Sequence, residues 1–124
     1  MIIKVIIGFA IFSMVILFLL FLFPLVKVCG YSMYPILYDG EFKIGRRVFR
    51  KTKCKIGEIY VFRPPYDSEE ERFVIKRLVH KEGNKLYFLG DNANDSYDSR
   101  YYGYVDCSKV VAHIKRNGGV NDGV

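Results

Sequence analysis

An uncharged apolar stretch from Val5 to Val26, rich in Ile, Leu, Phe and Val, constrains the fold of this chain most. When helical, a run of about 20 apolar residues matches the hydrocarbon thickness of a bilayer. Lys4 precedes the stretch and Lys27 follows it, so both ammonium groups can reach lipid headgroups. The stretch is longer than the apolar region of a cleavable signal peptide and lacks a small-residue cleavage site. We therefore expect residues 1–27 to form an uncleaved transmembrane anchor.

After the anchor, short segments rich in β-branched and aromatic residues alternate with turn residues. Strand-like runs bounded by Gly, Pro, Asn and Asp are typical of an all-β domain. We expect this domain to occupy residues 28–116, and the Gly- and Asn-rich residues 117–124 to form a flexible tail. The expected strands are Lys27–Gly30, Glu41–Phe49, Glu58–Arg63, Phe73–His80, Lys85–Leu89 and Lys109–Lys115.

The formal net charge is +6, and many of the cations follow the anchor closely. Such a cluster could bind nucleic acid, lie against anionic lipid headgroups, or be ordinary solvated surface. An anchor upstream favours lipid over nucleic acid. The same cations argue for a cytoplasmic domain by the positive-inside rule, but that rule weakens for large translocated domains. The cluster comprises Lys43, Arg46, Arg47, Arg50, Lys51, Lys53 and Lys55.

Three cysteines, Cys29, Cys54 and Cys107, leave at least one thiol unpaired in a monomer. The sequence does not indicate which pair would form a disulfide, and free buried thiols are the default expectation. His80 and His113 are isolated, and no CxxC spacing suggests zinc. The Asp- and Asn-rich residues 91–98 do not fit an EF-hand calcium loop. We expect no metal and no cofactor.

Ser32 lies just past the anchor, in the segment Gly30–Pro35. Gly30 permits unusual backbone angles and Pro35 fixes its own, so these flanks could hold the serine in a defined turn. A serine in a Gly- and Pro-containing loop is more often an ordinary loop residue. Ser32 by itself is therefore only a candidate nucleophile.

Lys76 lies in the strand-like segment 73–79, where alternate residues share one face. This alternation places Lys76 on an apolar face with Val74 and Leu78. Burial disfavours the ammonium and lowers the pKa of a lysine, which then can take a proton from a hydroxyl. The simpler alternative is a lysine whose amine reaches water from a half-buried strand. A serine with a neutral lysine is a known pair for nucleophilic catalysis.

A long polar segment, Leu89–Gly103, separates two strand-like runs. Long loops inside compact domains are often functional. Ser96 could hydrogen-bond a lysine amine and orient it, and Asp98 and Arg100 could pair to brace the loop. The alternative is a solvated cluster of turns formed by Asp and Asn side chains.

The anchor and the segments that contain Ser32, Lys76 and Ser96, taken in their order along the chain, resemble type I signal peptidases, the serine–lysine proteases of family S26. Residues 32–35 read Ser-Met-Tyr-Pro, similar to the S-M-x-P box of the family. Residues 57–62 resemble its G-D-(I/V)-V-x-F strand, and Lys76-Arg77 resembles its catalytic Lys-Arg pair. Residues 90–92 and 96–100 resemble its G-D-N…S-x-D-S-R box. Four boxes in the correct order behind an anchor make a specific combination.

The resemblance implies a signal-peptidase-like β-barrel or sandwich with Ser32 as nucleophile and Lys76 as general base. The backbone N–H of Ser32 would contribute to the oxyanion hole, and Ser96 would orient Lys76. Met33 and Pro35 would lie near the substrate and the membrane. The resemblance assigns oxyanion or supporting roles to Gly30, Arg77, Asp91, Asn92, Ser96, Asp98 and Arg100.

The sequence also departs from the family pattern. Gly30 stands where some members have a serine that donates to the oxyanion, so a second donor would be a backbone N–H or water. Ile36 stands where Thr is common, and the large insertion of longer members is missing. Lys76 argues against the microsomal type, which uses histidine at this position.

The expected function is therefore a bacterial signal peptidase I in the cytoplasmic membrane, with its catalytic domain on the extracytoplasmic side. Its partners would be preprotein signal peptides and the lipid bilayer, with no nucleic acid, and the chain is expected to be monomeric. A peptidase of the same superfamily that matures a pilin for plasmid transfer is an alternative. A LexA-like self-cleaving protease and a non-catalytic membrane-tethered binding module are weaker alternatives.

Overall fold

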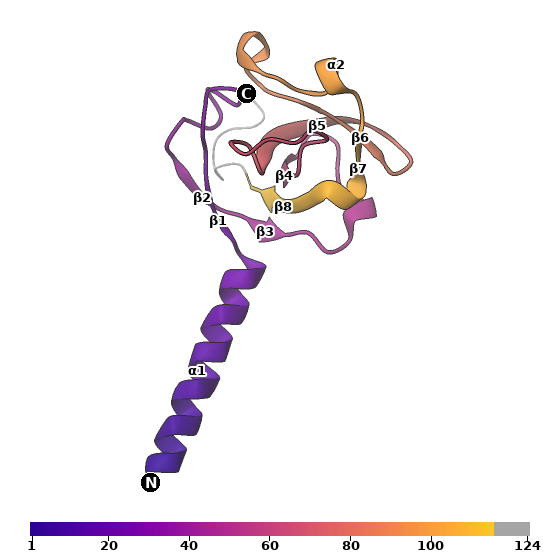
Figure 1. The fold of residues 1–124 in the computed structure, drawn as a ribbon. Coiled ribbons are helices and arrows are strands. Elements are labelled where there is room, and N and C mark those ends of the chain that lie inside the picture. The colour runs from indigo at the N-terminus through magenta and orange to yellow at the C-terminus, as the bar shows by residue number, and fades with distance from the viewer. Residues whose placement is uncertain (116–124) are drawn as a thin grey trace.

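The computed structural model describes residues 1–115, so the expected tail at 117–124 lies outside the described residues. Helix α1 (Ile2–Leu22) projects from a β-rich domain, and no residue of α1 is buried (Figure 1). Its 21 residues span about 30 Å, and its length and apolar composition suit a membrane-spanning helix. The helix ends two residues before Pro24, whose ring cannot continue a helix.

The β domain contains a two-stranded ribbon and a six-stranded sheet, and every strand pair is antiparallel. This arrangement confirms the expectation of a mainly β domain behind an apolar helix. The ribbon pairs β1 (Leu25–Lys27) with β2 (Phe42–Ile44). The sheet has the order β3-β8-β4-β5-β6-β7. Its strands are β3 (Arg46–Arg47), β4 (Ile59–Phe62), β5 (Val74–Glu82), β6 (Lys85–Leu89), β7 (Val105–Asp106) and β8 (Val110–Ile114).

Three details differ from the expected strands. The first strand covers Leu25–Lys27 instead of Lys27–Gly30, so it includes Leu25 and Val26, which were expected in the anchor; Gly30 turns the chain with a φ of 90°. The expected strand Glu41–Phe49 divides at Gly45 into β2 and β3, which join different sheets. A side chain at Gly45 would lie 3.3 Å from Ile114 Cδ1, so glycine suits this crossing. Strand β7 was not expected, because two residues are too short to show an alternating pattern.

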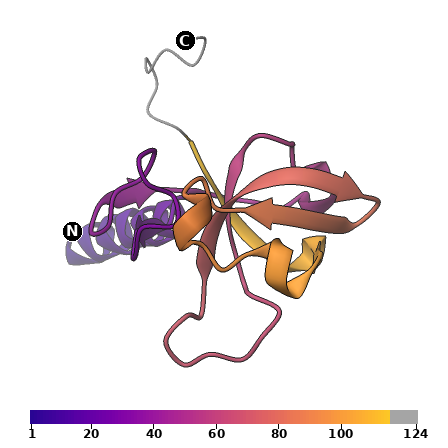
Figure 2. The ribbon, with the colours of Figure 1, turned by 90° about the horizontal axis from the view of Figure 1, so that it is seen from above.

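The short helical segments lie in the connections between strands. Helix α2 (Ser99–Tyr102) follows β6, and single 3₁₀ turns occupy Lys51–Lys53, Ala93–Asp95 and Cys107–Lys109. Figure 2 shows the connection between β4 and β5 extending away from the sheet. This extended connection contains the acidic segment 67–71.

Two clusters of buried apolar side chains lie on either side of the central strand β4, all of whose residues are buried. In one cluster, Phe62 stacks on Phe88 with ring centroids 4.1 Å apart. The second cluster contains Met33, the residue that follows Ser32. Strand β5 directs Val74 and Leu78, the neighbours of Lys76 on the same face, into the first cluster. Met33, next to Ser32, packs in the second cluster, so the two candidate residues are held by different halves of the core.

Candidate active site

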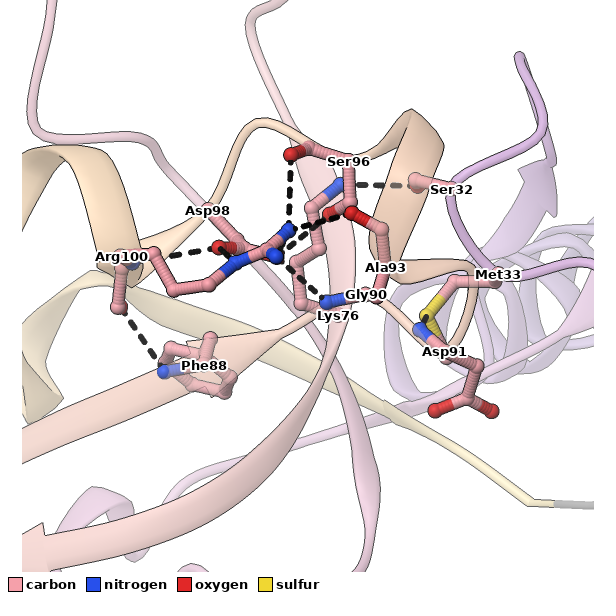
Figure 3. Close-up of polar contacts among 11 residues, drawn as sticks. Ser32, Met33, Lys76, Phe88, Gly90, Asp91, Ala93, Ser96, Asp98 and Arg100 are labelled. Carbon is pink, nitrogen blue, oxygen red and sulfur yellow. Dashed lines mark hydrogen bonds and ion pairs between the residues drawn. The ribbon is translucent and has the colours of Figure 1, made fainter.

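The structure brings Ser32 and Lys76, which are 44 residues apart in the sequence, into contact. The Lys76 Nζ lies 2.9 Å from the Ser32 Oγ, and Figure 3 shows the amine directed at the serine. Lys76 lies on β5 between Val74 and Leu78, and all three side chains are buried as their alternation predicts. Only 6% of Lys76 is exposed. The pair thus has the separation that proton transfer from the hydroxyl to the amine requires.

Burial lowers the pKa of the Lys76 amine, because an ammonium loses its hydration in the protein interior. The nearby carboxylates of Glu71 and Asp98 oppose this shift without cancelling it. The environment therefore shifts the equilibrium of Lys76 towards the neutral amine, the form that accepts a proton.

The segment Gly90–Asn92 holds the backbone around Ser32 in place. The Asn92 N–H donates to the Ser32 carbonyl oxygen over 2.8 Å. The Asn92 side-chain amide donates to the Tyr31 carbonyl oxygen over 3.0 Å, and the Asp91 N–H lies 3.5 Å from the Met33 sulfur. The Met33 side chain is almost fully buried. The nucleophile segment, residues 31–33, is therefore held both by these hydrogen bonds and by the packing of Met33 in the core.

Arg77 joins this segment to the strand that carries Lys76. Its Nε and Nη2 atoms donate to the two carboxylate oxygens of Asp91 over 2.8 and 2.7 Å. Its Nη1 donates to the Gly57 carbonyl oxygen over 2.6 Å. The two-point pairing restricts the relative orientation of the planar groups. Through this pairing with Asp91, Arg77 positions the segment Gly90–Asn92, which is hydrogen-bonded to the backbone of Ser32.

Asp98, whose side chain is fully buried, is the centre of a second set of hydrogen bonds. It accepts from the Ser96 hydroxyl at 2.7 Å, the Gly90 N–H at 2.9 Å and the Arg100 Nε at 2.9 Å. Burial acts to raise the pKa of Asp98, but these donors outweigh it and lower the pKa to about 2. Asp98 is therefore a charged structural centre, and it also caps α2 by accepting from the Arg100 N–H.

Ser96 was expected to orient Lys76. Within residues 1–115, the hydrogen bond of the Ser96 hydroxyl is made with Asp98, and none joins it to Lys76. Sequence reasoning also missed Ser99, whose buried hydroxyl accepts from the Phe88 N–H over 2.9 Å and fastens α2 to β6. A second serine directly after the aspartate was visible in the box, but nothing in the sequence indicated its partner.

Replacing Asp98 with asparagine is expected to lower the free energy of unfolding by about 2 kcal/mol at neutral pH. The native carboxyl has a pKa of about 2, below the unfolded value of about 4, so its stabilisation is present above pH 4. That contribution is lost as the pH falls towards 2. The melting temperatures of the wild type and of Asp98→Asn, measured in detergent, should therefore converge as the pH falls from 4 to 2. A constant difference in melting temperature across this range would contradict the role given to the Asp98 charge.

An open cleft of about 750 Å³ leads to Ser32 and Lys76. Glu70 and Glu71, two exposed residues of the connection between β4 and β5, also line this cleft. Gly30 is exposed, and its N–H donates to Asp39 Oδ1 over 2.7 Å. Pro35, which follows Ser32 in the sequence, is also exposed. Within the described chain, no hydrogen-bond acceptor receives the Ser32 N–H. The cleft is lined by Lys27, Cys29, Gly30, Tyr31, Ser32, Glu70, Glu71, Phe73, Val74, Ile75, Lys76, Asn94, Asp95, Ser96, Tyr97 and Tyr101.

All three cysteines are free thiols in the structure, with Cys29 exposed and Cys54 and Cys107 buried. Within residues 1–115, no group of three or more His, Cys, Asp or Glu side chains is arranged to hold a metal ion.

The sequence profile of the family described as "Signal peptidase, peptidase S26" matches residues 2–86 and 81–116. These ranges include α1, Ser32, Lys76 and the segment from Gly90 to Arg100. The chain is also 28% identical to mitochondrial inner membrane protease subunit 1 of Schizosaccharomyces pombe over 115 aligned residues. That alignment covers 76% of this chain and 72% of the relative.

Proposed function

Because this chain belongs to the peptidase S26 family of signal peptidases, we propose that it is a membrane-bound signal peptidase that uses Ser32 and Lys76. Its substrates are preproteins, cut after a small residue at the end of the signal peptide. The observation that carries the proposal is the 2.9 Å approach of the Ser32 Oγ to the Nζ of a buried lysine. A lysine held on an apolar strand face has little other reason to meet a serine hydroxyl.

In the proposed reaction, neutral Lys76 takes the proton of the Ser32 hydroxyl while the oxygen attacks the scissile carbonyl carbon. The resulting tetrahedral intermediate collapses to an acyl-enzyme, and the Lys76 ammonium gives its proton to the departing amine. Lys76 then takes a proton from water, which attacks the ester and releases the signal peptide. Returning that proton to Ser32 restores the starting pair.

The oxyanion of each tetrahedral intermediate needs hydrogen-bond donors that already point at it. The Ser32 N–H is one candidate, since no acceptor within residues 1–115 engages it. Gly30 supplies no side-chain donor, so the second donor in this proposal is a backbone N–H or a water molecule. Losing one such donor costs other enzymes about 2.7–4 kcal/mol of transition-state stabilisation.

The other box residues are positioning residues in this proposal. Arg77 and Asp91 set the distance between the strand of Lys76 and the nucleophile segment. Arg100 and Asp98 brace the following loop, with Ser96 bonded to Asp98. Their replacement should therefore reduce the rate by misplacing Ser32 or Lys76, not by removing a reacting group.

The test is cleavage of a model preprotein in liposomes by the full chain and by Ser32→Ala. Ser108→Ala is the matched control, because Ser108 is exposed and lies outside the cleft. We expect cleavage after a small residue by wild type and Ser108→Ala, and none by Ser32→Ala. Activity that survives in Ser32→Ala would reject Ser32 as nucleophile. A wild type that neither cuts several preproteins nor reacts with a serine-directed lipopeptide or β-lactam probe would favour a non-catalytic tethered module.

We also place the catalytic domain on the extracytoplasmic side of a bacterial cytoplasmic membrane, where signal-peptide cleavage sites emerge. Cys29 offers a direct test, because it is exposed while Cys54 and Cys107 are buried. A membrane-impermeant maleimide should label the full chain in intact spheroplasts, and Cys29→Ser should abolish the labelling. Labelling that appears only after lysis would put the domain in the cytoplasm.

A further inference from the structure

A second cleft, of about 550 Å³, lies between the end of α1 and the segment from β3 to the 3₁₀ turn at Lys51–Lys53. Leu22 and Phe23 form the wall that comes from the end of the helix. This cleft shares no lining residue with the cleft at Ser32. The proposed peptidase reaction therefore leaves it without a role.

The side chains around this cleft are strongly basic. Five cations line it, and Glu58 is the one carboxylate among its lining residues. Glu58 is already engaged, since its carboxylate lies 2.9 Å from His113 Nε2. Within residues 1–115, none of the five cations forms an ion pair with a carboxylate, which leaves a surplus of positive charge. The lining cations are Arg46, Arg47, Arg50, Lys53 and Lys55.

Direct contacts fix this cleft to the last turn of α1. The Arg47 Nε donates to the Phe21 carbonyl oxygen over 2.7 Å, and its guanidinium lies 4.2 Å from the centroid of the Phe21 ring. The ring of Phe49 approaches that of Phe21 with centroids 6.2 Å apart. In Figure 1, β3 is the strand of the large sheet that lies beside the end of the helix. When α1 spans a bilayer, the cleft therefore lies where the helix enters the headgroup layer.

We propose that this cleft binds the phosphate-bearing headgroup of an anionic phospholipid from the bilayer that holds α1. Phosphate oxygens accept charge-assisted hydrogen bonds from guanidinium and ammonium groups, which are the groups that line the cleft. The exposed Phe23 and Phe49 give the acyl chains an apolar surface beside the headgroup. The lipid takes precedence over nucleic acid because the cleft is built against the end of the helix and not on a free face of the sheet.

The proposal rests on α1 crossing a bilayer, not on the chemistry at Ser32, so either can fail without the other. The test uses the full chain in non-ionic detergent micelles, with native mass spectrometry to count retained lipid. Phosphatidylglycerol is the anionic probe and phosphatidylcholine the zwitterionic one. The test variant is Arg46→Gln/Arg50→Gln/Lys53→Gln, which spares Arg47 because that side chain fastens β3 to α1. The control Arg63→Gln/Lys85→Gln/Lys109→Gln removes the same charge from residues outside the cleft.

Wild type and control are expected to retain phosphatidylglycerol in preference to phosphatidylcholine. The test variant should bind phosphatidylglycerol roughly 10- to 100-fold more weakly, since each cation near a lipid surface contributes to binding. Equal retention by the test variant and the control would overturn the proposal, as would displacement of the lipid by millimolar inorganic phosphate or by a short oligonucleotide. If the triple variant melts below the control, Arg50→Gln alone must still weaken retention for the proposal to stand.

Discussion

Replacing Lys76 with methionine is expected to abolish peptide cleavage while raising the thermal stability of the chain. The two side chains are similar in length, and the site is almost closed to water, with 6% of Lys76 exposed. Methionine removes the base, which should cost about 10²–10⁴-fold in rate. It also removes an amine whose charged form is disfavoured by burial. We expect a gain of roughly 1–2 kcal/mol in the free energy of unfolding near neutral pH.

The gain should depend on pH in a defined direction. The pKa of Lys76 is lower in the folded chain than in the unfolded chain, so the unfolded chain binds the additional proton. The stability of the wild type therefore rises with pH until the unfolded lysine loses its proton near pH 10. The advantage of Lys76→Met should shrink over the same range. The cleavage rate of the wild type should rise with pH, with a midpoint below the ordinary lysine value.

Thermal melts in detergent and cleavage assays on the same samples test both halves of this expectation. Lys85→Met is the matched control, because Lys85 lies on β6 with a largely exposed side chain. It should leave cleavage unchanged and alter stability by less than about 0.5 kcal/mol. A destabilised Lys76→Met, or an advantage that grows with pH, would show that burial of the amine is not a cost to the fold.

The anchor and most strands could be predicted because each has a regular local pattern: a continuous apolar run for the anchor, and alternating or β-branched segments for the strands. Twenty-two uncharged residues from Val5 to Val26 predict a bilayer-length helix, although α1 ends at Leu22 and Leu25 and Val26 belong to β1. Alternation in segment 73–79 placed Lys76 on the buried face, and the structure has it there. The break at Gly45 could not be predicted, because β2 and β3 pair with strands of two different sheets, and no local pattern reports which partners they take.

The site could be predicted as a set of residues but not as a set of contacts. The order of the boxes pointed to Ser32 and Lys76, yet no local pattern reports the distance between residues 44 positions apart. Glu71 shows the limit most clearly. It is an exposed residue of an acidic segment, and nothing local to that segment shows that the path of the chain from β4 to β5 brings it to the cleft.

The basic residues after the anchor admit two physical explanations with opposite consequences. By the positive-inside rule they indicate a cytoplasmic domain. The structure instead concentrates Arg46, Arg50 and Lys53 around one cleft at the end of α1. If these cations bind a lipid headgroup, their position after the anchor does not indicate the direction in which α1 is inserted. The proposed lipid site would therefore remove the conflict between the positive-inside rule and an extracytoplasmic catalytic domain.

Replacing Gly90 with alanine is expected to damage both the fold and the reaction. Gly90 lies where the nucleophile segment meets the loop that contains Asp98, and its N–H donates to that carboxylate. A methyl group here would overlap the Ser96 hydroxyl, and would lie 2.6 Å from Ser96 Cβ and 2.7 Å from the Ser32 carbonyl oxygen. The Ser32 carbonyl cannot move aside freely, because its oxygen accepts from the Asn92 N–H. We expect a loss of about 1–3 kcal/mol in stability and of roughly 100-fold in rate.

The double variant Gly90→Ala/Ser96→Gly separates the two contacts. It removes the overlap with Ser96 but keeps the methyl group against the Ser32 carbonyl oxygen. Part of the stability should return while the rate stays low, because the displaced atom belongs to the nucleophile. Gly83→Ala is the control: its φ of 59° strains an alanine by about 1 kcal/mol, yet no atom lies within 4 Å of the added methyl group. Full activity in Gly90→Ala would mean that the backbone of Ser32 tolerates displacement, and the precise placement proposed for the nucleophile would then be wrong.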